Sequence, residues 1–230
     1  MTVEEIRAAV DAVTWYHTID LGQGIVTPGV DHTLARLAVL NLPADLTGRS
    51  VLDIGAWDGA FSFEAERRGA SPVMAVDTFC WSGEGWGTKA GFDTARRILD
   101  SKVQDREVEV MDLSPETVGV YDLVLCLGVL YHMKHPLLTL ERVASVCSNQ
   151  LILWTQIDLA HLETAAMAFY PGTELNDDPT NWCGPNPACV IGMLQTAGFR
   201  RAECVYTWLA EPKAPGLQAA QGNAIFHAWK

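Results

Sequence analysis

The chain has 230 residues, a length that suits one domain of ordinary size and is too short for two full ones. Apolar residues make up 49% of the sequence, which is enough to bury a sizeable core. The 16 Lys and Arg residues face 28 Asp and Glu residues, so the net charge is −12. Because proteins bind nucleic acids largely by neutralising phosphates with basic side chains, this charge argues against a nucleic-acid partner.

The cysteines and the N-terminal residues indicate the compartment. None of the six cysteines forms a C-x-x-C pair, and Cys126 lies in an apolar, strand-like run, as a reduced thiol in the cytoplasm would. The N-terminus has acidic residues early and no long apolar stretch, so we expect no signal peptide. No run approaches about 18 consecutive apolar residues, so we expect no association with a membrane.

Apolar segments with helical and strand-like spacing alternate along the first two thirds of the chain. They predict, in order, a helix over 2–13, a helix over 31–41, a strand over 50–54, a helix over 60–68, a strand over 72–76, a helix near 90–102, strands over 107–111 and 121–127, a helix near 136–146 and a strand over 150–155.

This alternation predicts an α/β fold in which helices cover both faces of a mostly parallel sheet. Two later strand-like runs, 203–208 and 224–229, bring the number of strands to seven and are expected to pair as an antiparallel hairpin across a Pro/Gly-containing loop. Residues 156–190 are rich in Pro, Asn and aromatic residues, which indicates an insertion after the fifth strand. We expect 1–48 to form an N-terminal helical lid and 49–230 to form the core.

The most informative motif is Val-Leu-Asp-Ile-Gly-Ala-Trp-Asp-Gly at 51–59, where a strand turns into a helix. Gly55 and Gly59 let the backbone approach a ligand closely and expose amide groups to it. Asp77 ends the next strand, 24 residues after Asp53. A carboxylate at that position can accept hydrogen bonds from both ribose hydroxyls of a nucleoside cofactor.

A third acidic residue, Asp112, is expected to end the third strand and to meet the adenine amino group. These acidic residues could be ordinary turn residues without a ligand, but their recurrence at three successive strand ends argues against that interpretation for all three. A dinucleotide site would need G-x-G-x-x-G to hold a pyrophosphate, but here Trp57 stands between the glycines and Asp53 precedes them. An acidic loop suits S-adenosylmethionine, which carries an ammonium and a sulfonium and no phosphate.

The run 53–59 resembles motif I of the class I S-adenosylmethionine-dependent methyltransferases, whose fold is Rossmann-like. Segments 61–70, 113–116, 128–132 and 179–182 are similar to a narrower group, the tRNA wobble-uridine carboxymethyl- and methyltransferase-like proteins, which includes many small-molecule methyltransferases. The resemblance extends from about residue 15 to residue 199.

The resemblance implies S-adenosylmethionine as the cofactor and S-adenosylhomocysteine as its product. It also implies a set of cofactor-binding residues at the carboxyl ends of the strands, namely Asp53, Gly55, Ala56, Trp57, Gly59, Asp77, Thr78, Asp112, Leu113, Leu127 and Gly128.

The sequence departs from this family in two respects. Many class I enzymes have glycine where Trp57 stands, so the methionine end of the cofactor is expected to meet a bulkier wall. The related tRNA enzymes act on a large polyanion, for which an acidic chain is poorly suited.

We therefore expect methyl transfer to an oxygen or nitrogen atom of a small molecule, of the kind found in secondary metabolism, by a monomer or homodimer. Two alternatives stay open: an RNA-modifying enzyme that methylates or carboxymethylates tRNA uridine, and a cofactor-binding module without catalytic activity.

Tyr131 and His132 are the candidate catalytic residues because they directly follow the fourth predicted strand. Ligands of open α/β sheets lie beyond the carboxyl ends of the strands. A neutral imidazole there can take a proton from the acceptor, or His132 can serve only to shape the pocket while proximity drives the reaction. His132-x-x-His135 lacks a convincing third ligand, so we expect no metal site.

Aromatic segments on either side of the core are candidates for binding the acceptor. Trp15, Tyr16 and His17 precede the core and can cover the site or anchor the N-terminal helix. Tyr170, Asn181 and Trp182 lie in the insertion and can form a pocket wall or only pack a loop.

The cofactor of the carboxymethylating tRNA relatives bears an extra carboxylate, which would require a cation, preferably an arginine. The basic residues near the expected cofactor and lid segments are Arg36, Arg49, Arg67, Arg68 and Lys89, and none is placed as an obvious pocket cation. The sequence therefore favours plain methyl transfer.

Overall fold

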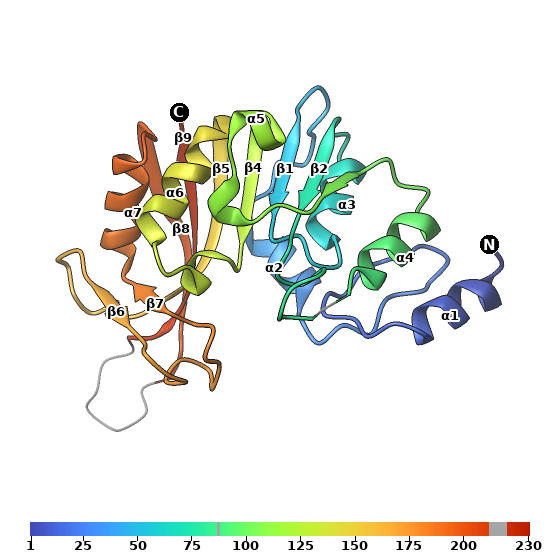
Figure 1. Ribbon diagram of the computed structural model, residues 1–230, viewed down its shortest axis with the longest axis horizontal. Helices are drawn as coiled ribbons and strands as arrows, with labels where there is room; N and C mark the ends of the chain where they lie inside the picture. The colour runs from blue at the N-terminus through green and yellow to red at the C-terminus, as the bar shows by residue number, and fades with distance from the viewer. Residues whose placement is uncertain (87, 212–219) are drawn as a thin grey trace. The chain divides into compact units, whose positions relative to one another are not determined.

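The structure is a computed structural model that describes residues 1–86, 88–211 and 220–230 (Figure 1). The chain divides into two compact units, residues 1–109 and residues 110–230.

Unit 1, residues 1–109, is built on three parallel strands in the order β3-β2-β1. All residues of β1 and β2 are buried, as expected for parallel strands that are covered on both faces. Helix α3 packs against both strands (Figure 1). The elements are α1 (Val3–Asp11), α2 (Thr33–Val39), β1 (Val51–Ile54), α3 (Ala60–Arg67), β2 (Val73–Val76), α4 (Ala90–Ile98) and β3 (Gln104–Arg106).

The register of β1 and β2 brings the motif at 51–59 next to the end of the following strand. Val51 pairs with Val73 and Ile54 pairs with Val76, so the two carboxyl ends are level. The Val76 carbonyl accepts hydrogen bonds from the amides of Gly55 and Ala56, at 2.9 and 3.1 Å. The loops that follow β1 and β2 therefore start side by side.

Unit 2, residues 110–230, has four strands in the order β4-β5-β9-β8, and β6 pairs with β7 separately. β4 and β5 are parallel, whereas β9 runs antiparallel to both β5 and β8. The elements are η1 (Val110–Asp112), α5 (Pro115–Val118), β4 (Tyr121–Leu127), η2 (Leu130–His132), α6 (Pro136–Ser145), β5 (Cys147–Ile157), β6 (Met167–Phe169), β7 (Cys183–Pro185), α7 (Pro187–Thr196), β8 (Arg201–Leu209) and β9 (Gly222–Trp229).

The expected fold class is confirmed: the structure is α/β with seven main strands, most of them parallel to a neighbour, and a C-terminal antiparallel pair. The expected Pro/Gly-containing loop between β8 and β9 includes residues 212–219, which lie outside the described residues. Helices α6 and α7 pack against each other and against strands of the unit 2 sheet (Figure 1).

The predicted strand over 107–111 is wrong, because β3 occupies 104–106 and a 3₁₀ turn follows at 110–112. The strand is polar and at a sheet edge, and it pairs with β2 through its backbone. Its central residue, Asp105, forms ion pairs with Lys89 and Arg96 of the segment that leads into and forms α4. Hydrophobic periodicity does not reveal a strand that is held by backbone pairing and by ions.

Helix α7 was not predicted, although its start has a sequence signal. Asn186 accepts a hydrogen bond from the Cys189 amide and Pro187 occupies the first turn, as is typical of helix N-termini. The buried Asn186 side chain also bonds the backbone of residues 162, 164 and 166. It therefore fixes the insertion segment to the start of the helix.

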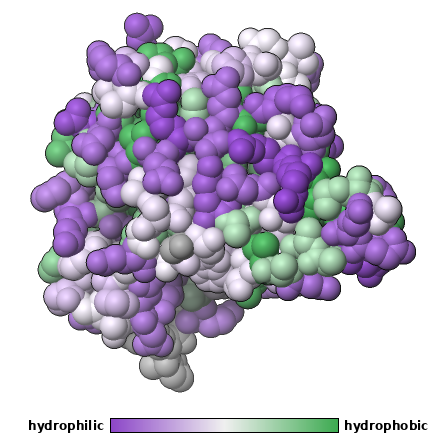
Figure 2. Space-filling view, turned by 45° about the vertical axis from the view of Figure 1, so that its right-hand side comes forward, coloured by the Kyte–Doolittle hydropathy of each residue, from purple (hydrophilic) through white to green (hydrophobic). Residues whose placement is uncertain are grey.

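In the described parts of the chain, every helix is too short or too polar to cross a membrane. Figure 2 shows a face on which hydrophilic side chains predominate and apolar ones gather in smaller patches.

Candidate functional site

The turn after β1 has a constrained backbone. Gly55 and Gly59 have φ angles of 72° and 83°, and Trp57 between them has a φ of 48°. This left-handed conformation costs a non-glycine residue about 1–2 kcal/mol. Two hydrogen bonds hold Trp57 in it: its amide donates to Asp77 Oδ2 at 3.0 Å, and its carbonyl accepts from the Trp81 indole at 2.7 Å.

Asp77 links the loops that follow β1 and β2. Its Oδ2 accepts the Trp57 amide, and its Oδ1 accepts the Cys80 amide at 3.0 Å. The side chain is buried, and desolvation raises the pKa of its carboxyl above the usual value. Asp77 thus organises the turn through backbone amides of both loops. A role in binding ribose hydroxyls stays a prediction.

Asp53 lies inside β1 and is fully buried. The Ser62 hydroxyl donates to its Oδ2 at 2.6 Å. Burial and, to a smaller extent, the charge of Asp77 raise the pKa of Asp53 to about 7, although the bond from Ser62 opposes both effects. The motif therefore concentrates carboxyl groups whose ionised forms disfavour one another, an environment that suits a cationic ligand.

Asp58, at the end of the motif, binds the N-terminal segment. Its Oδ2 accepts the amides of Tyr16 and His17, at 2.8 and 2.9 Å. Burial raises the pKa of Asp58 to about 6. Burial also lowers the pKa of His17 to about 3, so this imidazole is neutral and its 3.9 Å contact with Asp58 is not an ion pair.

An aromatic cluster covers the motif within unit 1. The Tyr16 ring stacks on Trp57 with centroids 3.8 Å apart and planes inclined by only 4°. Trp86 meets Trp57 edge-on at 5.0 Å and donates to the Thr14 carbonyl at 3.2 Å. Trp15 is buried and donates to the Val10 carbonyl, so it anchors α1.

Of the three expected N-terminal candidates, Trp15 and His17 are buried, and half-buried Tyr16 covers the motif. Their part in binding an acceptor stays a prediction.

The polar atoms at the ends of β1 and β2 fit a nucleoside cofactor. The indole nitrogen of Trp57 and the hydroxyl of Thr78 are buried and have no hydrogen-bond partner in the described structure. Unpaired buried donors are rare, and each one calls for an acceptor. Together with the carboxyl groups of Asp53 and Asp77, they form a set that suits a ligand with hydroxyl groups and positive charge.

Packing also requires glycine at position 59, whereas the expected role of Gly59 in binding the cofactor stays a prediction. A Cβ at this position would lie 2.6 Å from the Phe92 ring and 2.8 Å from the Phe63 ring. Close packing and the left-handed φ therefore require glycine at this helix start, independently of any ligand. Ala56 beside it is buried.

In unit 2 the expected cofactor residues follow η1 and β4. Asp112 lies in the 3₁₀ turn η1, so the expectation that it ends a strand is wrong; the strand was misplaced because β3 has no hydrophobic pattern. Leu113 is fully buried, and Leu127 is nearly so. Gly128 has a φ of 82°, and a Cβ there would lie 3.0 Å from the Trp154 ring.

His132 ends the 3₁₀ turn η2, just beyond β4. Its Nδ1 lies 3.0 Å from both the carbonyl oxygen and the hydroxyl oxygen of Thr180. Burial lowers the pKa of His132, so the half-buried imidazole is neutral at pH 7. The Tyr131 ring packs beside it at 4.2 Å between centroids, and the Tyr131 carbonyl accepts the Trp182 amide at 2.8 Å.

The candidates in the insertion differ in exposure. Tyr170 is buried, and its hydroxyl donates to Asp158 Oδ2. The same oxygen accepts from the side-chain Nε2 of Gln221 at 3.1 Å. Asn181 is buried, and its Nδ2 donates to a backbone carbonyl while its Oδ1 has no partner in the described structure. Trp182 is half-buried, and the Lys134 ammonium lies 4.5 Å from its ring centroid.

Several residues that organise these sites were not among the candidates expected from the sequence. Asp58 lies in the motif, and Ser62 lies three residues after it. Their side chains bind other parts of the same protein, and such contacts produce no distinctive residue spacing in the sequence. Thr180 belongs to the Pro-Thr-Asn-Trp segment singled out from the sequence, whereas Asp178 lies just outside it.

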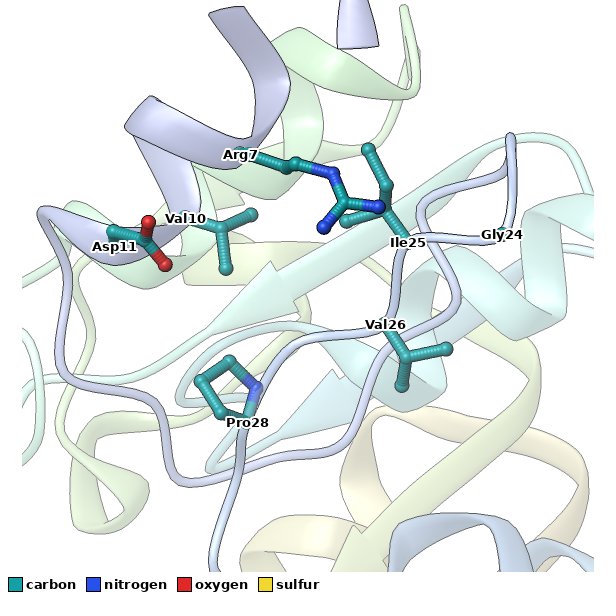
Figure 3. A pocket seen from close by; sticks show the side chains of 7 residues that line it. All are labelled: Arg7, Val10, Asp11, Gly24, Ile25, Val26 and Pro28. Carbon is teal, nitrogen blue, oxygen red and sulfur yellow. The ribbon is translucent and has the colours of Figure 1, made fainter. Parts of the chain in front are cut away.

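A pocket of about 220 Å³ lies between α1 and the loop around residues 24–28 (Figure 3). The guanidinium of Arg7 extends over Ile25, and the pocket's lining includes none of the predicted site residues (Figure 3). The lining residues are Arg7, Val10, Asp11, Gly24, Ile25, Val26 and Pro28.

Comparison with known proteins identifies a family. Residues 28–199 match a family model described as a methyltransferase domain. Curated relatives include the tRNA U34 carboxymethyltransferases of Actinobacillus succinogenes, 28% identical over 171 residues, and of Trichlorobacter lovleyi, 30% identical over 165 residues. Each match covers 70% of this chain and 48% of the relative, so the chain spans about half the length of these proteins.

Among solved structures, the N-terminal domain of EvdMO1, crystallised in the presence of SAH and D-fucose, has a TM-score of 0.70 and 20% identity. The match covers 98% of this chain and 95% of that domain. An S-adenosylmethionine-dependent methyltransferase of Listeria monocytogenes, described as putative, has a TM-score of 0.58 and 18% identity, over 86% of this chain and 96% of that one. At these identities the likeness shows a shared fold.

The buried carboxyls of Asp53 and Asp58 predict how stability depends on pH. Both have pKa values above the ordinary 3.8, so the folded state holds their protons more tightly. This contribution to stability is complete below about pH 4 and is lost as the pH rises through about 6 and 7. Asp53→Asn should make the decline between pH 4 and 8 shallower by at least about 1 kcal/mol, measured by urea unfolding.

Asp45→Asn is the matched control for this measurement. Asp45 is exposed and its pKa is lowered by its bonds with Thr47, so its loss should leave the decline unchanged. If Asp53→Asn followed the wild-type pH profile, Asp53 would not be a buried carboxyl with a raised pKa.

Proposed function

The chain belongs to the methyltransferase-domain family, and we propose that it is an S-adenosylmethionine-dependent methyltransferase that methylates an oxygen or nitrogen atom of a small molecule. When bound, the cofactor supplies a methyl group activated by a sulfonium. The protein's residues bind and orient the reactants and accept the proton that the acceptor loses.

The charge of the protein carries the proposal of a small acceptor. The net charge is −12, and four of the five cations near the expected cofactor and lid segments form ion pairs with acidic side chains. Arg36 pairs with Asp31, and Lys89 pairs with Asp105. A polyanionic substrate such as tRNA would need cations that are available to its phosphates.

The solved neighbours support the same class of acceptor. The N-terminal domain of EvdMO1 matches the whole chain in length, and it was crystallised with SAH and a sugar, D-fucose. A sugar hydroxyl is an acceptor of the proposed kind.

A second candidate function is modification of tRNA uridine, favoured by the names of the curated relatives. Those relatives are about twice as long as the matched region, so the binding of tRNA by them can draw on residues that have no counterpart here. Transfer of a carboxymethyl group would also need a cation for the extra carboxylate. Arg67 and Arg68 both pair with Glu64, which supports plain methyl transfer.

Each expected residue has a role in this proposal. Asp77 and Thr78 bind the ribose side of the cofactor, and Asp53 and the glycines of the motif accommodate its charged end. Asp112, Leu113, Leu127 and Gly128 contribute the adenine side. His132 accepts the acceptor's proton, with Tyr131 beside it. Tyr16 and Trp182 contribute to the acceptor pocket, together with Trp15, His17, Tyr170 and Asn181.

The proposal includes the organisation of the protein. Residues 1–48 act as a lid on the core at 49–230, and the segment at 156–190 provides specificity. The protein works in the cytoplasm as a monomer or homodimer, on a metabolite of secondary metabolism.

S-adenosylhomocysteine should raise the melting temperature, because a ligand that binds only the folded state stabilises it. The stabilisation should be about 2.7 kcal/mol at a concentration one hundred times the Kd. Asp77→Ala should weaken binding at least tenfold, because two ribose hydroxyls lose a charged acceptor. Calorimetric titration of the two proteins measures the change.

Glu84→Ala is the control, since it removes an acidic side chain from the exposed loop after β2. Because Asp77 also holds Trp57 and Cys80, the melting temperature of each free variant is measured first. Wild-type affinity in folded Asp77→Ala would place the ribose contact elsewhere.

Release of S-adenosylhomocysteine from S-adenosylmethionine should increase with a small hydroxyl- or amine-bearing acceptor and not with total tRNA. The probes are a panel of sugars and amines that includes D-fucose, and gel shifts with tRNA at low salt give binding directly. A submicromolar Kd for tRNA that weakens with salt would overturn the small-acceptor proposal and support the second candidate.

His132→Ala should reduce turnover of an acceptor found in that panel by about 10²–10⁴-fold, because a general base is lost. Affinity for S-adenosylhomocysteine should stay near the wild-type value. The exposed neighbour His135, changed to alanine, is the matched control. If His132→Ala turned over normally from pH 6 to 9, positioning alone would account for catalysis.

A further inference from the structure

The environment of His132 determines which of its ring nitrogens carries the proton. Nδ1 lies 3.0 Å from two oxygens of one residue, the carbonyl and the hydroxyl of Thr180. A carbonyl oxygen can only accept a hydrogen bond. An unprotonated Nδ1 would place two lone pairs opposite each other, so the carbonyl favours a proton on Nδ1.

The hydroxyl of Thr180 could reverse this preference if it donated to Nδ1. Asp178 prevents that, because its Oδ1 lies 2.7 Å from the Thr180 hydroxyl and accepts its proton. The hydroxyl has one proton to give, so towards Nδ1 it presents a lone pair. Both oxygens near Nδ1 therefore act as acceptors.

The backbone fixes this arrangement on both sides. The Thr180 amide donates to the same Asp178 Oδ1 at 2.8 Å, which sets the orientation of the carboxylate. The Trp182 amide donates to the Tyr131 carbonyl at 2.8 Å, which holds the two segments together next to His132. These two hydrogen bonds thus hold the His132 ring and the two Thr180 oxygens in place.

We propose that Thr180 and Asp178 are positioning residues that hold neutral His132 in the Nδ1–H tautomer and leave the Nε2 lone pair as the atom that takes the acceptor's proton. The identity of the proton donor rests on the proposed function, whereas the tautomer is a property of the free protein. In the step, the Nε2 lone pair forms a bond to the proton of the acceptor's O–H or N–H group. The O–H or N–H bond breaks, and its electron pair stays on the acceptor oxygen or nitrogen that attacks the methyl group.

The tautomer is measured by long-range ¹H–¹⁵N NMR of the free protein, without cofactor or acceptor. His132→Gln identifies the His132 signals among those of the six histidines. We expect a protonated Nδ1 and an unprotonated Nε2 at pH 7.5. A wild-type spectrum with the proton on Nε2 would overturn the proposal.

Three variants test the role of each partner. Asp178→Ala frees the Thr180 hydroxyl to donate to Nδ1, so a measurable share of the Nε2–H tautomer should appear. Asp178→Asn should keep the wild-type tautomer, because its amide oxygen still accepts from Thr180. Adding Thr180→Val to Asp178→Ala should restore Nδ1–H, because only the carbonyl then faces the ring.

The restoring double variant separates a positioning role from simple loosening of the loop, which a second substitution would not reverse. Asp177→Asn is the matched control on the adjacent exposed acid. An Asp178→Ala spectrum with only Nδ1–H would remove Asp178 from the proposal.

In turnover, Asp178→Ala should lower kcat roughly tenfold to a hundredfold, as for other residues that orient a functional imidazole, and leave the KM for S-adenosylmethionine unchanged. If the tautomer behaves as expected while His132→Ala retains full turnover, the base role in the proposed function fails and the tautomer assignment stands. If the proton is found on Nε2 while His132→Ala is inactive, the tautomer assignment fails and the base role of His132 stands.

Discussion

Buried carboxyl groups at the ends of β1 and β2 need hydrogen-bond donors, and this need determines the structure of unit 1. Asp77 accepts the amides of Trp57 and Cys80, so it joins the two loops that follow the strands. Asp58 accepts the amides of Tyr16 and His17, so it brings the N-terminal segment onto the motif. The strained turn at Trp57 persists because these neighbours over-determine it.

The same carboxyl groups make the site selective for charge. Burial raises the pKa values of Asp53 and Asp77, and a nearby acidic charge raises each further: that of Asp77 for Asp53 and that of Glu109 for Asp77. A cation close to these carboxyl groups would favour their ionised forms. A sulfonium and an ammonium would relieve that repulsion, whereas a pyrophosphate would add to it. The electrostatics of the motif thus suit a cationic cofactor, and the net charge of the chain supports the proposed small acceptor.

Around His132 the hydrogen bonds set orientation more than stability. Thr180 presents two acceptors to one ring nitrogen, and Asp178 removes the only proton that could compete. A network of this kind is satisfied in a single arrangement, which defines the atom available to a reactant. A comparable network joins the buried side chains of Tyr170 and Asp158 to half-buried Gln221, so it ties the insertion to the residue before β9.

The sequence by itself determined the fold class and the motif at 51–59, because mostly apolar strands and glycines in a tight turn leave local patterns. It indicated the cofactor through the acidic residues of the motif and through the family resemblance. It misplaced β3, where Asp105 is held by ions from distant Lys89 and Arg96, and it did not indicate α7. Only the tertiary structure showed that Asp58 holds the N-terminal segment and that the Thr180 hydroxyl lies between Asp178 and His132. The physical reason is that a hydrogen bond between residues far apart in the chain depends on distance in space and leaves no periodic trace in the sequence. Asp58 and Tyr16 are 42 residues apart, and Thr180 and His132 are 48 residues apart.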